Sequence, residues 1–153
     1  MEMKGNEIIN NLEGIIKVFS NTIPCKVKTK VNYDENEIDF DIEYLVYCSF
    51  CKKSIVTNIH IYEYNDKYMF RLFAFITDGA DYNFDLWDYL VYKNITFDEE
   101  IFNCHIPQNE WYNTVYCYSN LIAYIIKDND MQRILDTDYA PEIPIDWSRC
   151  GYK

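Results

Sequence analysis

A regular alternation of polar and apolar residues over residues 25–77 constrains the fold of this chain more than any other feature. In residues 25–32 lysines alternate with valine or threonine, and in residues 37–44 carboxylates alternate with apolar residues. A period of two is typical of a half-buried β-strand, because successive side chains point to opposite faces of a sheet. The sequence therefore predicts strands that place one face on a core.

These segments predict a four-stranded antiparallel meander over about residues 25–77. In this prediction Tyr33–Asn36 is a four-residue hairpin loop, so the lysines of the first strand face the carboxylates of the second. The second strand continues to Phe50 and turns at Lys52-Lys53, and the third turns at Asn65-Asp66, residue types that tolerate positive φ. The predicted cross-strand partners include Lys30–Asp39, Lys28–Asp41, Lys26–Glu43, Phe50–Ile55, Tyr44–Ile61, Ile61–Phe70 and Ile55–Ile76.

Helical periodicity occurs on both sides of the predicted sheet. Apolar residues recur every three or four positions over residues 5–20, which predicts an amphipathic N-terminal helix. Residues 81–92 predict another helix, and residues 95–106 are compatible with a short strand. A long helix follows, with Asn109 as its candidate N-cap. Its predicted buried stripe consists of Trp111, Val115, Tyr118, Ile122 and Ile125. The predicted fold class is therefore α+β, with helices packed on one face of the sheet.

The length of the chain predicts a single domain over residues 1–153, because domains commonly have about 100–200 residues. Residues 128–130 interrupt the long helix, and Met131–Leu135 predict one more helical turn. From about residue 137 the chain predicts an extended tail. We expect this tail to pack back on the domain, and a partner-binding arm is the alternative.

The charge balance excludes some functions. The chain has 25 acidic and 14 basic residues, a net charge of −11. This balance disfavours direct binding to nucleic acid or to an anionic membrane, and favours a basic partner. The longest apolar run, Leu121–Ile126, is far short of the roughly 20 residues that span a bilayer. The start of the chain lacks the features of a signal peptide, so a cytoplasmic location is expected.

No motif in the chain predicts a catalytic residue, a metal site or a cofactor. The CxxC spacing of Cys48–Cys51 has no second pair of ligands nearby, so we interpret it as coincidence, with zinc binding and redox chemistry as alternatives. The six cysteines are expected to be reduced in a cytoplasmic protein. Asp81–Asp85 begins like a calcium loop, but Leu86 stands where that loop requires glycine. The two histidines, His60 and His105, are not marked as part of any catalytic pair.

The site prediction depends on acids that have few basic neighbours. Four aspartates between residues 78 and 88 are spaced to lie on one stripe of a helix, where like charges cost a few tenths of a kcal/mol per pair. Their presence favours a basic partner, and a solvated acidic face is the alternative. A further acidic segment covers residues 128–146. The candidate partner-binding residues are Asp78, Asp81, Asp85, Asp88, Tyr89, Asp98, Glu99 and Glu100.

Aromatic residues, which make up 18% of the chain, are the second functional signal. Tyrosine is enriched in binding surfaces, because it brings a large contact area at a low entropic cost. A bias of the genome toward tyrosine codons is the competing explanation. The tyrosines that fall off the predicted core stripes are Tyr47, Tyr62, Tyr82, Tyr89, Tyr92 and Tyr112.

The leading functional hypothesis is an acidic protein–protein interaction module. It would be an inhibitor or an antidefence-type protein, related to phage or host defence, that engages a basic, nucleic-acid-binding protein. The first alternative is a dimeric adaptor or chaperone-like module that binds an apolar segment of a client. The second is a small enzyme or ligand-binding protein that uses Asp and Glu in a concave pocket.

Overall fold

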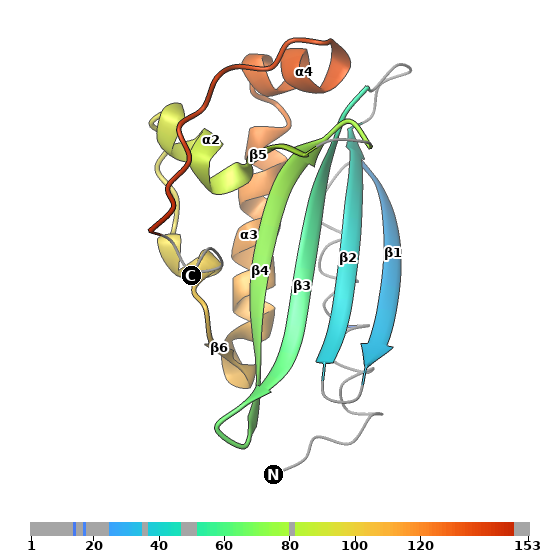
Figure 1. The fold of residues 1–153 in the computed structure, drawn as a ribbon, viewed down its shortest axis with the longest axis vertical. Coiled ribbons are helices and arrows are strands. Elements are labelled where there is room, and N and C mark those ends of the chain that lie inside the picture. The colour runs from blue at the N-terminus through green and yellow to red at the C-terminus, as the bar shows by residue number, and fades with distance from the viewer. Residues whose placement is uncertain are drawn as a thin grey trace.

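The protein has two layers, an antiparallel sheet and a set of helices packed against one of its faces (Figure 1). This arrangement is seen in a computed structural model and confirms the α+β class. The predicted N-terminal helix over residues 5–20 lies outside the described residues, apart from two helical positions. The structure describes the backbone of residues 25–34 and 37–46, and backbone and side chains of residues 14, 17, 52–79 and 82–148.

The sheet is built on the predicted meander. Its first four strands follow one another in space and in sequence, each antiparallel to the next. They are β1 (Cys25–Asp34), β2 (Glu37–Val46), β3 (Ser54–Tyr64) and β4 (Lys67–Thr77). Two further strands, which the sequence did not clearly predict, pair with the outer edge of β4. They are β5 (Tyr82–Asp85) and β6 (Ile106–Pro107).

The pairing of β3 with β4 has the predicted register. Ile61 lies opposite Phe70, and Ile55 lies opposite Ile76. The connecting residues Asn65 and Asp66 both have positive φ, 50° and 63°, as a tight two-residue hairpin turn requires. The register was predictable here because the turn chemistry and the apolar alternation indicate the same pairing.

The predicted pairing of β1 with β2 is wrong by two residues. Lys30 lies opposite Asp41 and Lys28 opposite Glu43, while Lys26 lies opposite Leu45. Only two residues separate the strands, instead of the predicted four. A shift of two leaves every residue on its predicted face, so the alternation alone cannot detect it. As a consequence, Asp39 lies opposite Asn32 and has no lysine partner at its register position on β1.

The predicted pairing of β2 with β3 is wrong by six residues. Tyr44 lies opposite Ile55, because β2 ends at Val46. Lys52 and Lys53 are not a hairpin turn. Their backbone N–H groups donate to the carbonyl of Leu135, at distances of 2.9 and 3.0 Å. This lysine pair therefore belongs to a tertiary contact that no local pattern encodes.

The side chain of Lys53 completes that contact. Its buried ammonium group donates to three backbone carbonyls, those of Ile134 at 3.0 Å, Thr137 at 3.0 Å and Tyr139 at 2.8 Å. These carbonyls lie at the end of the last helix and in the segment after it, where a helix leaves carbonyls without partners and favours a positive charge. Burial lowers the pKa of this ammonium group.

The predicted helix over residues 81–92 begins later than expected. The chain first forms β5, and α2 (Leu86–Tyr92) follows directly. Asp85 is the N-cap of α2, because its carboxylate accepts a hydrogen bond of 2.8 Å from the N–H of Trp87. An N-cap residue has extended backbone and lies outside the helix. The predicted acidic stripe therefore does not lie on one helix.

The remaining helical elements follow in the second half of the chain. They are the 3₁₀ turns η1 (Glu99–Phe102) and η2 (Gln108–Glu110) and the helices α3 (Trp111–Ile125) and α4 (Asn129–Asp136). The prediction of Asn109 as an N-cap is wrong, because η2 precedes α3 and contains this residue. Asp128 caps α4 by accepting from the N–H of Met131 at 3.3 Å.

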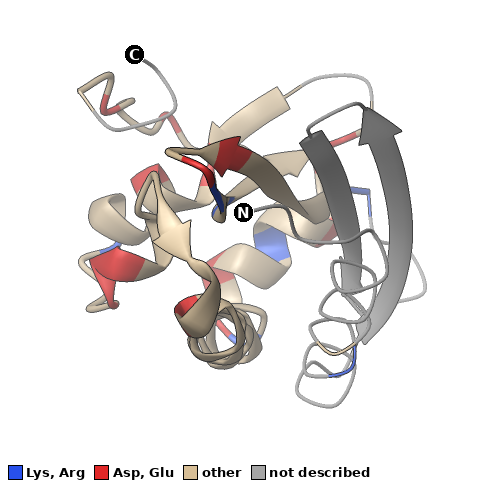
Figure 2. Ribbon diagram, turned by 90° about the horizontal axis from the view of Figure 1, so that it is seen from below, with Lys and Arg blue, Asp and Glu red and all other residues tan. Residues whose placement is uncertain are grey.

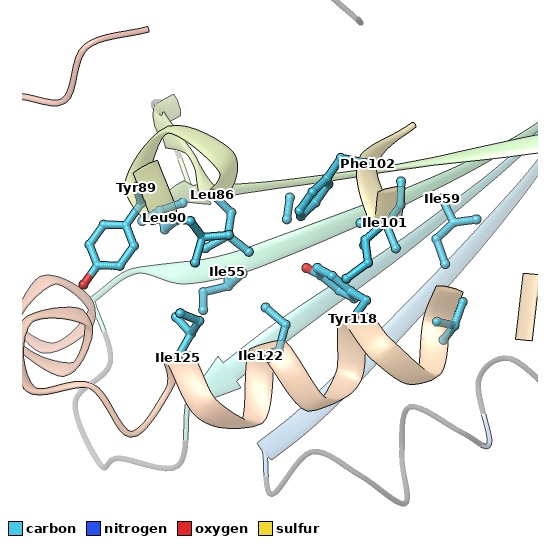
Figure 3. Close-up of a cluster of buried hydrophobic side chains, with 14 of the residues drawn as sticks. Ile55, Ile59, Leu86, Tyr89, Leu90, Ile101, Phe102, Tyr118, Ile122 and Ile125 are labelled. Atoms are coloured by element: carbon cyan, nitrogen blue, oxygen red, sulfur yellow. The ribbon is translucent and has the colours of Figure 1, made fainter. Parts of the chain in front are cut away.

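The core lies between α3 and the inner face of the sheet (Figure 3). The five residues of the predicted stripe on α3 are all buried, which confirms that prediction. The ring nitrogen of Trp111 donates to the carbonyl of Ile106 at 2.9 Å, and the hydroxyl of Tyr118 bonds Thr57 of β3. Both polar groups are thus satisfied inside an apolar environment.

The tail from Thr137 to Ser148 contains no helix or strand, and it lies on the domain as far as Asp146. The backbone N–H of Asp146 donates to Asp88 of α2 at 3.1 Å, and Ile143 packs against the core. Trp147 is nevertheless 66% exposed. No helix among the described residues is long and apolar enough to cross a membrane.

None of the described helices covers the outer face of β3 and β4 (Figure 1). Alternate residues of the two strands on this face are half-buried. The guanidinium of Arg71 lies 4.6 Å from the centre of the Phe73 ring, and the Phe75 ring lies 5.5 Å from that of Tyr82.

Candidate functional site

Acidic side chains are displayed on the surface by η1. Asp98 caps this turn by accepting a hydrogen bond of 3.0 Å from the N–H of Glu100. Ile101 and Phe102 are buried, and the Phe102 ring contacts that of Tyr118 edge to face. Because the apolar half of the turn is anchored in the core, the acidic half is held outward, and all three of its acids are exposed.

The outer face of α3 is aromatic and uncharged. Tyr112, Tyr116 and Tyr124 are exposed, with Tyr116 at 55% and Tyr124 at 64%. They occur at multiples of four residues, and Asn120 occupies the remaining position, so the four residues follow one side of the helix. No lysine or arginine occurs between Lys93 and Lys127 in the sequence. Figure 2 shows acidic and basic residues along the described helices.

Tyr112 also explains a glycine in the N-terminal region. A Cβ atom at Gly14 would overlap the Tyr112 ring and hydroxyl. Glycine at this position leaves room for the end of the Tyr112 side chain, which would have to shift if a larger residue replaced it. The sequence indicated only a small loss of helix propensity at Gly14.

A small polar hollow of about 60 Å³ lies between η1 and the first half of α3. Asp98, Glu100 and Glu110 are among the residues that line it. Among the described residues of its lining there is no lysine or arginine. The others that line it are Ile101, Asn103, His105, Ile106, Asn113, Thr114 and Cys117.

The loop that forms one wall of this hollow is fixed to the sheet by an aromatic contact. The hydroxyl of Tyr62 donates to the carbonyl of Cys104, so it accepts a hydrogen bond from Nδ1 of His105. The Tyr64 ring stacks on His105, with ring centres 3.9 Å apart. Burial raises the pKa of Tyr62. These contacts hold His105 beside the hollow.

Three of the predicted partner-binding residues lie inside the protein. Asp85 is the buried cap of α2, and Asp88 is 3% exposed and accepts from the tail. Tyr89 is fully buried, and its hydroxyl donates to Asp128 at 2.6 Å. Figure 3 shows this ring among the buried apolar side chains, with its hydroxyl directed toward α4. These residues join α2 to the tail and to the start of α4.

The other predicted residues differ in position. Asp78 is exposed at the end of β4, and Asp81 lies outside the described residues. Asp98, Glu99 and Glu100 lie together on η1. The sequence prediction did not include Glu110, nor Tyr116 and Tyr124. The helical periodicity of α3 could have identified them, since each falls outside the buried stripe.

The described residues were also compared with the requirements of a metal site and of a larger pocket lined by acids. Among the described residues no group of three or more His, Cys, Asp and Glu side chains is placed to hold a metal ion. A second hollow, of about 480 Å³, lies at the β3–β4 turn and is lined by Asn65–Met69 and Pro107–Asn109. Asp66 is the only acid among the described residues of that lining.

Two of the cysteines can be assessed. Cys117 is a free thiol, while Cys104 is disulfide-bonded. The expectation that all cysteines are reduced is therefore wrong for Cys104. The CxxC pair Cys48–Cys51 lies outside the described residues.

Comparisons with protein families, with curated proteins and with solved structures find no match to this chain.

Proposed function

We propose that this protein is an acidic interaction module that engages a basic, nucleic-acid-binding protein, as an inhibitor of the antidefence type would. The proposed surface, called here the α3–η1 surface, consists of Asp98, Glu99, Glu100, Glu110, Tyr112, Tyr116 and Tyr124. The observation that carries the proposal is the combination of exposed acids and exposed tyrosines in a stretch of chain without lysine or arginine.

The two kinds of residue have complementary roles in such an interface. Exposed carboxylates attract a basic surface over distances of about a Debye length, which raises the rate of association. Tyrosine side chains then supply contact area with little loss of side-chain entropy. A partner surface that binds nucleic acid is basic, because it contacts phosphates. The carboxylates of the α3–η1 surface can therefore occupy the positions of those phosphates.

Affinity capture from lysate of the native host, identified by mass spectrometry, tests the proposal. We expect a basic protein to be captured at about 50 mM salt and largely lost at about 500 mM, because salt screens exposed charges. The triple variant Asp98→Asn, Glu99→Gln, Glu100→Gln should lose the same protein. Capture that is equal at both salt concentrations would contradict the acidic mechanism.

A matched control keeps the same change in charge but moves it away from the surface. The triple variant Glu63→Gln, Asp66→Asn, Glu142→Gln removes three exposed acids that lie outside the α3–η1 surface. It should capture the partner nearly as well as the natural sequence does. If both triple variants lose the partner equally, net charge alone is responsible. A stable homodimer in native mass spectrometry, with no captured basic protein, would favour the dimeric adaptor instead.

A further inference from the structure

A hollow of about 480 Å³ lies where the β3–β4 turn meets β6 and η2. The turn and β6 lie at the same end of the sheet (Figure 1), and the pairing of Met69 with Pro107 joins them. The turn is a tight hairpin, in which Asn65 and Asp66 have positive φ. Both walls of the hollow are therefore built on regular backbone structure. The volume falls within the roughly 300–1,000 Å³ of pockets that hold a small molecule.

Part of the lining is apolar, and this part is more buried than the rest. Tyr68, Met69 and Pro107 line the hollow and are half-buried. Tyr68 also packs against the core, which limits the movement of its side chain. An aromatic ring presents a flat apolar surface of large area. The hollow therefore offers a place on which the apolar face of a small ring can lie.

The polar part of the lining consists mainly of carboxamide groups. These groups belong to the exposed residues Asn65, Gln108 and Asn109. A carboxamide has N–H donors and a carbonyl acceptor, so it can pair with a hydroxyl group in either direction. The three residues come from two segments of the chain, the hairpin turn and η2. A ligand with several hydroxyl groups along its edge can therefore contact both segments at once.

The charges of the lining cancel. Asp66 and Lys67 are the charged residues among those described there, and they are adjacent in the chain and opposite in sign. A chain with a net charge of −11 thus has a hollow whose described lining carries no net charge. Such a lining favours neither an anion nor a cation, because recognition of a charged ligand depends on a complementary potential. The ligand that fits is therefore neutral and polar.

We propose that this hollow binds a neutral sugar in the form of a hexopyranose ring. The hydroxyl groups along the edge of the ring pair with the carboxamides of Asn65, Gln108 and Asn109, and the C–H face of the ring lies on Tyr68. None of the described lining residues belongs to the α3–η1 surface, so this inference goes beyond the proposed function and does not depend on it.

The test is a titration of the ¹⁵N-labelled full chain, followed by amide chemical shifts. The probes are the methyl glycosides of glucose, mannose, galactose and N-acetylglucosamine. Cyclohexanol is the matched control, because it has a ring of the same size but only one hydroxyl group. We expect saturable shifts at the amides of Asp66, Met69 and Asn109 with at least one glycoside, and none with cyclohexanol. Saturable shifts with none of the glycosides, or equal responses to cyclohexanol, would overturn the proposal.

Variants then assign the shifts to the hollow. Gln108→Ala and Asn109→Ala should each weaken glycoside binding by about two- to ten-fold, the range expected for one neutral hydrogen bond. Asn103→Ala removes an exposed carboxamide that is not in the described lining, and it should leave the affinity unchanged. If Asn103→Ala weakens binding as much as Gln108→Ala does, the proposal fails.

A pair of variants tests the contact with the Tyr68 ring. Tyr68→Phe keeps the flat ring and should retain the affinity, whereas Tyr68→Leu removes the ring and should weaken binding by about two- to ten-fold. Because Tyr68 packs against the core, thermal unfolding of both variants checks that they are folded at the temperature of the titration. Equal affinities of the two folded variants would mean that the sugar does not lie on this ring, which contradicts the proposal.

Discussion

Two acidic segments lie close together in the sequence but differ completely in their surroundings. Asp85 and Asp88, around the start of α2, are buried, and each accepts a hydrogen bond from a backbone N–H group. Asp98–Glu100 follows ten residues later and is exposed. The first segment holds α2 in place, and the second is available to a partner. Acid content alone therefore does not identify a binding surface.

What differs between the two segments is the position of their apolar neighbours. In η1 the acids come first and the buried pair Ile101 and Phe102 comes after them, so the two halves separate into surface and core. Around α2 the acids are interleaved with buried Leu86, Tyr89 and Leu90. Carboxylates in that setting need donors nearby, because an unsatisfied buried charge is strongly destabilising.

The largest expected effect comes from removing the apolar anchor of η1. Phe102→Ala should lower the free energy of unfolding by about 3–5 kcal/mol, because it leaves a cavity in the core. Urea denaturation measures the change. Phe73→Ala is the matched control on the outer face of the sheet, where the side chain is only half-buried, and should lower the free energy of unfolding by about 1.5 kcal/mol or less. Equal losses in the two variants would show that Phe102 is not an anchor.

A smaller effect should distinguish the buried acids from the exposed ones. Asp88→Ala removes the acceptor of the Asp146 N–H and should lower the free energy of unfolding by about 1–3 kcal/mol. Glu99→Ala changes an exposed acid and should alter it by no more than about 0.5 kcal/mol. Denaturation of the two variants at one pH makes the comparison. A change of similar size in both would mean that burial does not separate the two segments.

The smallest expected change in the free energy of unfolding is that of Tyr89→Phe, and its size depends on pH. Burial and the hydrogen bond to Asp128 raise the pKa of Tyr89 well above its usual range. The usual pKa of tyrosine is about 10, so below this pH the Tyr89 hydroxyl is neutral in both the folded and the unfolded state and its full contribution to stability is present. Above this pH the hydroxyl ionises first in the unfolded state, so the contribution is lost as the pH rises. Tyr89→Phe should lose about 0.5–1.5 kcal/mol at neutral pH.

Thermal unfolding between about pH 8 and pH 11 measures this signature, since the unfolded tyrosine ionises in this range. The natural sequence should lose stability more steeply at the alkaline end than Tyr89→Phe does. Tyr92→Phe is the control, because Tyr92 is exposed, and it should follow the natural sequence. Parallel curves for all three proteins would contradict the role given to Tyr89.

The sequence predicted the parts of the fold that are encoded locally. The β3–β4 hairpin has both turn residues and alternation, and the core stripe of α3 has helical spacing over its whole length. The β1–β2 and β2–β3 registers were missed, because shifts of two and six residues keep each residue on its face. The role of Lys53 depends on carbonyls far away in sequence, and no pattern in the residues around it reveals this role.

The candidate site was predicted only in part for a related reason. Helical spacing from Asp78 to Asp88 indicated one exposed stripe, but β5 occupies the first part of that segment and the cap at Asp85 begins the helix. The tail then covers Asp88. Asp98–Glu100 kept its predicted exposure, since no distant segment contributes a donor to it among the residues described.

The carbonyl contacts of Lys53 have a consequence for how this protein is made. They join residues separated by 81, 84 and 86 positions in the chain. During synthesis on the ribosome the β3–β4 hairpin is complete once Thr77 has emerged, but Lys53 cannot find its acceptors until Tyr139 has followed. A nascent chain arrested before that point holds a finished hairpin and a lysine without its acceptors, so this contact closes only near the end of translation.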